Sequence, residues 1–219
     1  MQRKLLLTSQ GIQKDFQEVF LNLLPKQPKD IRVSFVTTAA LGEEKNPQWL
    51  TIYRDQLKSL GISNIEDLDI RGKTYELLQN ILCEKDIIFM NGGNSFYLLK
   101  WIKESSFDNL LPRLLNKGVI YVGVSAGSYI CCPTIEQSTW KHQDRNKVGL
   151  KDFSALNLVP FLISAHYEEK YKTIIEQAAK TTKYPIVTLN DAQAVLVIDN
   201  AYEIVGKGNS IFLNGYKNC

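Results

Sequence analysis

The sequence predicts an α/β fold, a three-layer sandwich in which helices cover both faces of a mostly parallel, doubly wound sheet. The first observation is a set of short apolar runs, rich in β-branched and aromatic residues as in buried strands, at residues 5–8, 33–37, 87–90 and 119–122, and residues 65–70 are a further candidate strand. The second is that segments with the apolar spacing of amphipathic helices separate these runs, at residues 16–24, 49–60, 75–82 and 96–115. Because neighbouring parallel strands need a crossover connection, this alternation predicts a parallel sheet between two helical layers.

The third observation is a change of pattern in the last part of the chain. An apolar run at 161–165 and a helical segment at 171–179 are followed by short strands at 186–189, 194–198, 202–205 and 211–213. Turn residues separate the last three strands, so we expect them to form an antiparallel meander at one edge of the sheet. No repeat, linker or low-complexity segment divides the chain, which predicts a single domain over residues 1–219.

Length and composition narrow the class of protein. A chain of 219 residues, 44% of them hydrophobic, can bury a substantial core without a metal or disulfide. The formal net charge is only +3 and the basic residues are scattered, which argues against a nucleic-acid partner. No apolar run is long enough to span a membrane, and the four cysteines show no C-x-x-C spacing. A strand-like segment begins near the N-terminus without an apolar leader, so we expect a cytoplasmic protein.

The segment Gly123-Val124-Ser125-Ala126-Gly127 follows a predicted strand and has the pattern of a nucleophile elbow. The turn from strand into helix is so tight that a Cβ at either flanking glycine would collide with neighbouring backbone. This turn presents the Ser125 hydroxyl above the sheet edge and directs the first helical amides at the position of a developing oxyanion. Ser125 is therefore the candidate nucleophile, and the Ala126 N–H a candidate oxyanion donor.

A second glycine turn, Asn91-Gly92-Gly93-Asn94, follows the strand expected at residues 87–90. The carboxyl ends of parallel strands meet at one edge of the sheet, so this turn should face the elbow. A backbone amide approaches a substrate closely only where side chains are absent, which makes the Gly93 N–H the second candidate oxyanion donor. Asn94 is a candidate substrate-binding residue, although it can also cap the helix that follows.

A serine hydroxyl needs a base, and the chain offers only two histidines. His142 lies in a polar run typical of a solvated loop, whereas His166 ends an apolar run at the carboxyl end of a predicted strand. His166 is therefore the candidate base. Asp191, also at a strand end, is the preferred acid to orient it, while Glu136 and Asp144 remain open alternatives.

These motifs resemble the aspartyl dipeptidase and cyanophycinase family of serine peptidases, whose fold is similar to class I glutamine amidotransferases. The resemblance rests on three blocks, Gly92-Gly93-Asn94-Ser95-Phe96, the elbow followed by Cys132-Pro133-Thr134-Ile135, and Leu156-Asn157-Leu158-Val159-Pro160 leading into His166-Tyr167. It implies Ser125 as nucleophile, His166 as base and the Gly93 turn as oxyanion site.

The chain departs from the family pattern at two places. In the dipeptidase branch an aspartate follows the nucleophile by fifteen residues, and here that position is Trp140. The cyanophycinase branch draws its acid from a loop after a later strand, which is similar to the placement of Asp191. The dipeptidase relatives also carry an insertion after the catalytic histidine, whereas this chain runs from His166 directly towards a helix.

The combined prediction is a serine peptidase that hydrolyses small peptides through an acyl-enzyme, with dipeptides carrying an N-terminal aspartate as the substrate class that the resemblance implies. Two alternatives stay open: ester or amide hydrolysis at the same site, and a catalytically degenerate binding module, which Trp140 motivates. We expect no metal, because neither histidine lies in a ligand-like cluster, and no nucleotide cofactor, because phosphate-binding glycine motifs are missing. An exposed strand at the edge of the meander would let two chains pair as a homodimer.

Overall fold

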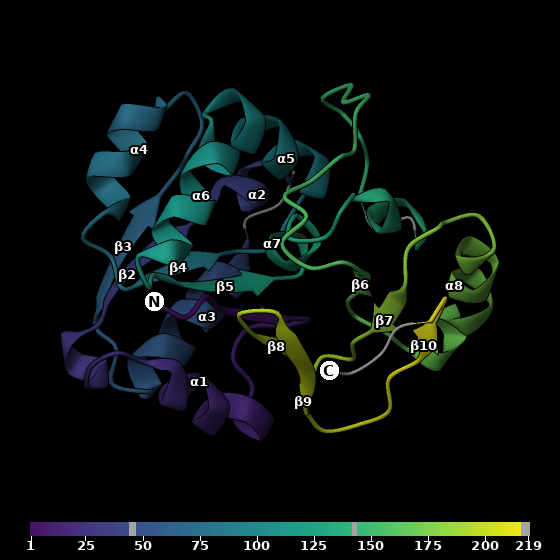
Figure 1. Ribbon diagram of the computed structural model, residues 1–219, viewed down its shortest axis with the longest axis horizontal. Helices are drawn as coiled ribbons and strands as arrows, with labels where there is room; N and C mark the ends of the chain where they lie inside the picture. The colour runs from purple at the N-terminus through teal and green to yellow at the C-terminus, as the bar shows by residue number, and fades with distance from the viewer. Residues whose placement is uncertain (44–46, 142–143, 216–219) are drawn as a thin grey trace.

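The computed structural model describes residues 1–43, 47–141 and 144–215. A seven-stranded sheet in the order β3-β2-β4-β5-β1-β8-β9 forms its centre (Figure 1). Five strands are parallel, namely β1 (Lys4–Thr8), β2 (Arg32–Val36), β3 (Asn64–Leu68), β4 (Ile87–Met90) and β5 (Ile120–Val124). The antiparallel strands β8 (Gln193–Ile198) and β9 (Ala201–Gly206) extend the sheet beyond β1. The mostly parallel α/β sheet predicted from the sequence is confirmed.

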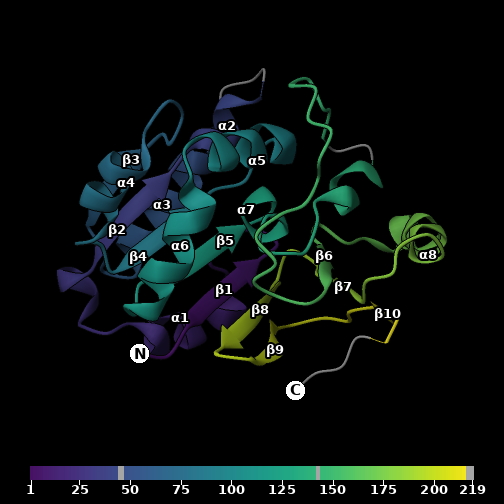
Figure 2. The same cartoon turned by 45° about the horizontal axis from the view of Figure 1, so that its top comes forward.

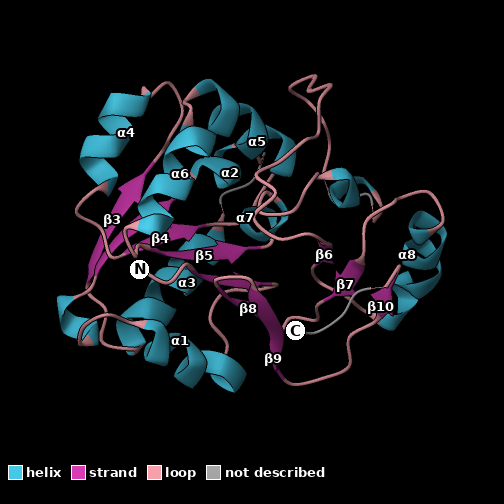
Figure 3. Ribbon diagram, in the orientation of Figure 1, coloured by secondary structure: helices cyan, strands magenta, loops and turns pink. Residues whose placement is uncertain are grey.

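Helices cover both faces of this sheet, as Figure 3 shows. One face packs against α4 (Tyr75–Leu82), α5 (Ser95–Glu104), α6 (Phe107–Asn116) and the short α7 (Ala126–Tyr129). The other packs against α1 (Gln17–Leu23) and α3 (Gln48–Ser59), while α2 (Thr38–Leu41) lies beside α5. Strands β4 and β5 are therefore buried at every residue, which explains why they read as continuous apolar runs rather than alternating ones.

A second, three-stranded sheet in the order β10-β7-β6 lies beyond the arrowheads of β1 and β5 (Figure 2). It contains β6 (Leu162–Ser164), β7 (Ile186–Thr188) and β10 (Phe212–Leu213), and α8 (Lys172–Ala179) links β6 to its parallel neighbour β7. Short 3₁₀ turns complete the described chain, namely η1 (Lys14–Phe16), η2 (Pro28–Asp30), η3 (Glu136–Thr139) and η4 (Glu169–Tyr171). The hydrophobic core on the α4–α7 face continues without a break into this sheet through residues such as Ile163 and Val187.

The prediction that the last three strands form one meander is wrong in its final strand. β8 and β9 form the expected hairpin at the sheet edge, but β10 leaves it and pairs antiparallel with β7. Gly206 and Gly208 both have positive φ angles and turn the chain away from β9, and the Gln193 side chain holds this turn by donating to the Gly208 carbonyl over 2.9 Å. Glycine conformations and one distant side chain, rather than the strand pattern, decide where β10 pairs.

The single helix expected over residues 96–115 is also wrong, because two helices occupy this segment. Ser106 adopts a left-handed conformation with φ 56° between α5 and α6. This left-handed conformation ends the helical hydrogen-bond ladder of α5, and the chain starts a new helix after it. The apolar spacing continues through the break because both helices bury one side in the same core.

Candidate active site

Ser125 lies at the sharp turn between β5 and α7, with φ 50° and ψ −108°, a strained conformation for a residue other than glycine. Its flanking glycines permit this turn. A Cβ on Gly123 would lie 2.6 Å from the Gly127 carbonyl oxygen, and a Cβ on Gly127 would lie 2.2 Å from the carbonyl oxygen of Met90. Both contacts are shorter than van der Waals packing allows, so the elbow geometry requires glycine at each position, as the sequence predicts.

Strand β1 fixes the elbow from the neighbouring side. The Ser125 N–H donates to the Thr8 carbonyl over 3.0 Å, and the buried Ser128 hydroxyl lies 2.8 Å from the same carbonyl and 2.9 Å from that of Gly123. The first turn of α7 closes on Ser125 itself, because its carbonyl accepts from the Tyr129 N–H over 2.9 Å. Main-chain hydrogen bonds and the Ser128 hydroxyl thus fix the backbone that carries Ser125 against β1, β5 and α7.

The Gly92-Gly93 turn at the end of β4 lies against the elbow. A Cβ on Gly92 would be 3.2 Å from the Ser125 Cβ, and one on Gly93, whose φ is 138°, would be 2.3 Å from the Ala39 carbonyl oxygen. The backbone therefore comes close to the serine only because side chains are absent here. The Ala126 N–H is at the first position of α7 and has no acceptor within its own helix.

Asn94 is the N-cap of α5. Its Oδ1 accepts from the Tyr97 N–H over 3.0 Å, and its Nδ2 donates to the Arg145 carbonyl over 3.1 Å. The side chain is buried and ties the start of the helix to the 144–150 loop. These contacts give Asn94 a structural task, and its role towards substrate stays a prediction.

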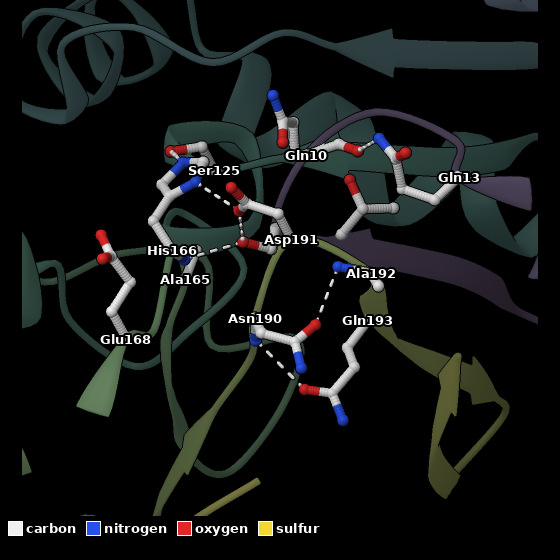
Figure 4. A network of polar contacts seen from close by, with 12 residues as sticks. Gln10, Gln13, Ser125, Ala165, His166, Glu168, Asn190, Asp191, Ala192 and Gln193 are labelled. Atoms are coloured by element: carbon white, nitrogen blue, oxygen red, sulfur yellow. Dashed lines mark hydrogen bonds and ion pairs between the residues drawn. The ribbon is translucent and has the colours of Figure 1, made fainter. Parts of the chain in front are cut away.

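His166 follows β6 and faces the elbow across the sheet edge (Figure 4). Its Nε2 lies 3.1 Å from the Ser125 Oγ, and its Nδ1 lies 2.6 Å from the Asp191 Oδ1. With the Nδ1 proton on the carboxylate side, Nε2 is free to accept the serine proton, which is the arrangement of a serine-hydrolase triad. The structure therefore brings together the three side chains that the sequence singled out.

The backbone around His166 is held by side chains from distant parts of the chain. The His166 N–H donates to the Ser9 Oγ over 2.7 Å, and the Ala165 N–H donates to the Tyr129 hydroxyl over 3.2 Å. The buried Lys141 ammonium donates to the Ala165 carbonyl. His166 itself has a φ of 54°. These three side chains restrain this left-handed backbone in a way that local sequence does not.

Asp191 lies in the turn between β7 and β8 (Figure 4). The Asn190 Oδ1 accepts from the Ala192 N–H over 2.8 Å, which shapes this turn, and the Ser9 hydroxyl donates to the Asp191 Oδ1 over 2.8 Å. Partial burial alone would raise the pKa of Asp191, but the hydrogen bonds from His166 and Ser9 outweigh it and lower that pKa. The carboxylate is therefore ionised when it meets the imidazole.

Ser9 is the residue of this site that the sequence analysis missed. It is fully buried at the carboxyl end of β1 and contacts both the base and the acid. Its position directly after the predicted strand at residues 5–8 was the available signal, because Ser125, His166 and Asp191 were all chosen for lying at strand ends.

The other carboxylates considered from the sequence do not contact the imidazole. Glu136 begins η3, and among the described residues no hydrogen bond or ion pair joins its side chain to His166. Asp144 binds the Ser95 N–H over 2.9 Å instead. Trp140, at the position of the dipeptidase aspartate, packs against the hydrophobic core. His142 lies outside the described residues.

A cleft of about 300 Å³ opens in front of Ser125 and His166. Gly92 and Gly93 line it beside the serine, and Asp144 lines it as well. Trp49, Tyr53 and Tyr129 give it an aromatic part. This volume is at the lower end of the range of about 300–1,000 Å³ typical of small-molecule sites, so the cleft suits a compact ligand.

Across residues 1–43, 47–141 and 144–215, no cluster of three or more histidine, cysteine, aspartate or glutamate side chains has the arrangement of a metal site. In the same part of the chain, none of the helices has the length and apolar character needed to cross a bilayer.

Comparison with known proteins gives a consistent result. The model of peptidase family S51 matches residues 5–205. The uncharacterized peptidase Lmo0363 of Listeria monocytogenes is 34% identical over 164 residues, which cover 70% of this chain and 77% of that protein. Peptidase E of Escherichia coli is 35% identical over a shorter stretch of 82 residues, 37% of this chain and 34% of the enzyme.

A solved structure agrees over nearly the whole chain. The 1.5 Å crystal structure of a Listeria monocytogenes protein provisionally described as peptidase E superimposes with a TM-score of 0.79 at 26% identity, covering 95% of this chain and 100% of that one. The family model spans most of the chain, and the relatives and the solved structure carry peptidase names. The chain therefore belongs to peptidase family S51 and is a serine-type peptidase.

Proposed function

We propose that this peptidase cleaves small peptides through an acyl-enzyme, with Ser125 as nucleophile, His166 as general base and acid, and Asp191 as the acid that orients the imidazole. The observation that carries the proposal is the continuous chain of contacts from the Ser125 Oγ to the His166 Nε2, at 3.1 Å, and from the His166 Nδ1 to Asp191, at 2.6 Å. A hydroxyl aligned in this way can pass its proton to the imidazole as it attacks.

The reaction begins when the Ser125 Oγ attacks the scissile carbonyl carbon and its proton moves to the His166 Nε2. The carbonyl oxygen becomes an oxyanion that the Gly93 and Ala126 N–H groups stabilise, and each such donor is worth about 10²–10³ in kcat. His166 then protonates the leaving amine as the peptide C–N bond breaks. A water molecule, deprotonated by His166, attacks the acyl-enzyme and releases the second product together with the serine.

The size of the cleft supports small peptides as the substrate, because about 300 Å³ accommodates only a few residues. The residues that line the cleft also bear on which side chain the N-terminal residue of the substrate carries. Among the described residues that line it, none is a lysine or arginine that could pair with a substrate aspartate. We therefore include both acidic and neutral N-terminal residues in the test below.

The experiment that tests the proposal is a dipeptide library assayed in parallel with the wild-type protein and Ser125→Ala. We expect hydrolysis by the wild type and a loss of at least about 10³-fold in Ser125→Ala, since the nucleophile is gone while the fold remains. A fluorophosphonate probe should label Ser125 in the wild type and nothing in the variant, as read by mass spectrometry. Undiminished peptide hydrolysis by Ser125→Ala would overturn the proposal.

A further inference from the structure

Asp144 is a carboxylate in the cleft that the proposed triad does not use. It lines the same cleft as Ser125, His166 and Gly93. Its Oδ2 accepts from the Ser95 N–H over 2.9 Å, at the beginning of α5, so one of its two oxygens is fixed by the backbone. Within the described part of the chain, no lysine or arginine nitrogen comes within 4.0 Å of it. The Asp144 charge thus lacks a direct cationic partner.

The surroundings of Asp144 disfavour this isolated charge. Burial raises the pKa of Asp144, and the hydrogen bonds from Ser95 and the more distant charges of His166 and Lys141 only partly offset that rise. The Lys141 ammonium is already directed at the Ala165 carbonyl. A partly buried carboxylate without a close counter-ion favours a cation that enters the cleft.

The position of Asp144 selects one kind of cation. Ser95, to which it is anchored, lies two residues after Gly93, the proposed oxyanion donor, and the carboxylate lines the same cleft as Ser125, within which the scissile carbonyl has to lie. In an unblocked N-terminal residue the amine nitrogen and the carbonyl carbon share one Cα, which keeps them about 2.5 Å apart. A lysine or arginine side chain would carry its charge several bonds further away. The α-ammonium group matches this short separation best.

We propose that Asp144 determines specificity by binding the free α-ammonium group of the substrate's N-terminal residue while the carbonyl of that residue lies at Ser125. This inference rests on the proposed peptidase function. Asp144 acts through an ion pair in the substrate complex and takes no part in the proton transfers. The cleft therefore discriminates against peptides whose amine is blocked.

The kinetic test compares a dipeptide that the wild type cleaves with its N-acetyl form, using the wild type, Asp144→Asn and the control Asp152→Asn. The asparagine keeps an oxygen for the Ser95 N–H, so the fold is retained, and Asp152 is an exposed carboxylate in the same loop region bonded to Lys103. We expect Asp144→Asn to raise KM for the free dipeptide about 10- to 100-fold, as for a lost charged hydrogen bond, with a smaller change in kcat. The N-acetyl form should be affected about twofold or less. An unchanged KM, or equal losses on both substrates, would overturn the assignment.

A binding measurement separates failure of this inference from failure of the proposed mechanism. Calorimetry of the same dipeptide with Ser125→Ala and with Ser125→Ala/Asp144→Asn requires no turnover. We expect Kd to rise about 10- to 100-fold in the double variant, whether or not Ser125 is the nucleophile. Equal Kd values would refute the role of Asp144 and leave the proposed mechanism at Ser125 unaffected. Fluorophosphonate labelling of Ser125 in Asp144→Asn needs no substrate amine, so it should proceed at the wild-type rate, and a loss of labelling would contradict a role limited to binding.

Discussion

The nucleophile and its base are held in place by different means, although their reacting atoms are only 3.1 Å apart. On the nucleophile side, backbone sterics decide the geometry, since a Cβ on Gly123 or Gly127 would overlap backbone atoms. On the base side, the backbone before and at His166 is held by side chains from distant segments. The first arrangement is encoded locally and the second only by the complete fold.

This difference has a consequence for mutation. A change at the elbow acts on the fold, because strands β4 and β5 and helix α7 pack on one another there. Removing the Ser9 hydroxyl beside His166 leaves the sheet intact and acts on the alignment of the imidazole. We therefore expect elbow variants to lose stability and Ser9 variants to lose activity, whereas the buried Lys141 makes stability depend on pH.

The largest effect is expected for Gly127→Ala, because the new Cβ would lie 2.2 Å from the Met90 carbonyl oxygen in the centre of the sheet. We expect the free energy of unfolding in urea to fall by about 3 kcal/mol or more, with little folded protein recovered. Gly72→Ala is the control, since no atom lies near the Cβ position of Gly72, and its positive φ, which Gly127 does not share, should cost only about 1 kcal/mol. Similar losses in both variants would show that sterics do not fix the elbow.

An intermediate effect is expected for Ser9→Ala, which removes the donor to Asp191 and the acceptor of the His166 N–H. The pKa of Asp191 should rise because one of the hydrogen bonds that lower it is lost. We expect kcat/KM to fall about 10- to 100-fold while the fold persists, as for loss of a hydrogen bond to a charged group. Ser34→Ala is the control, because Ser34 is a buried serine of β2 whose hydroxyl has no partner among the described residues. Equal activities of the two variants would argue against the role given to Ser9.

The smallest effect is expected in the pH dependence of the free energy of unfolding, to which the buried Lys141 contributes. Burial lowers the pKa of Lys141 to about 8, although Asp191, Glu168 and Asp144 oppose the shift. Between that value and about 10.4 in the unfolded chain, the unfolded state binds the extra proton, so this residue makes stability rise with pH.

The measurement compares the free energy of unfolding of the wild type with that of Lys141→Met from pH 8 to pH 10. We expect the difference to change in favour of the wild type by about 2 kcal/mol across this window. Groups that titrate in the same way in both proteins contribute equally to the two free energies of unfolding, so their contributions cancel in the difference. If the difference stayed constant with pH, the pKa of Lys141 would be the same in the folded and unfolded protein, which would contradict the lowered pKa of this buried lysine.

The sequence predicted the parts of the molecule that depend on local pattern. The strands of the parallel sheet follow from their apolar runs, and Ser125 follows from the glycines that its turn requires. His166 and Asp191 were found because both lie at predicted strand ends. Each of these signals is contained in a few neighbouring residues.

The rest depends on contacts between distant segments. Ser9 is 157 residues from His166 along the chain, and its role exists only once β1 lies beside β5 and β8. The pairing of β10 with β7 and the break at Ser106 depend on backbone conformations that apolar spacing does not record. Asp144 was considered only as an acid, because its position in the cleft could not be seen before α5 and its loop were placed.

The most direct test of the central claim, that Asp191 is the acid of the triad, is the rate of fluorophosphonate labelling of Ser125 in Asp191→Asn and Asp144→Asn. Both aspartates lie close to His166, but only Asp191 contacts its Nδ1. We expect Asp191→Asn to slow labelling by about 10³–10⁴-fold, because the imidazole loses its orientation and correct tautomer. We expect Asp144→Asn to be labelled at about the wild-type rate. A large loss in Asp144→Asn with normal labelling of Asp191→Asn would contradict the claim.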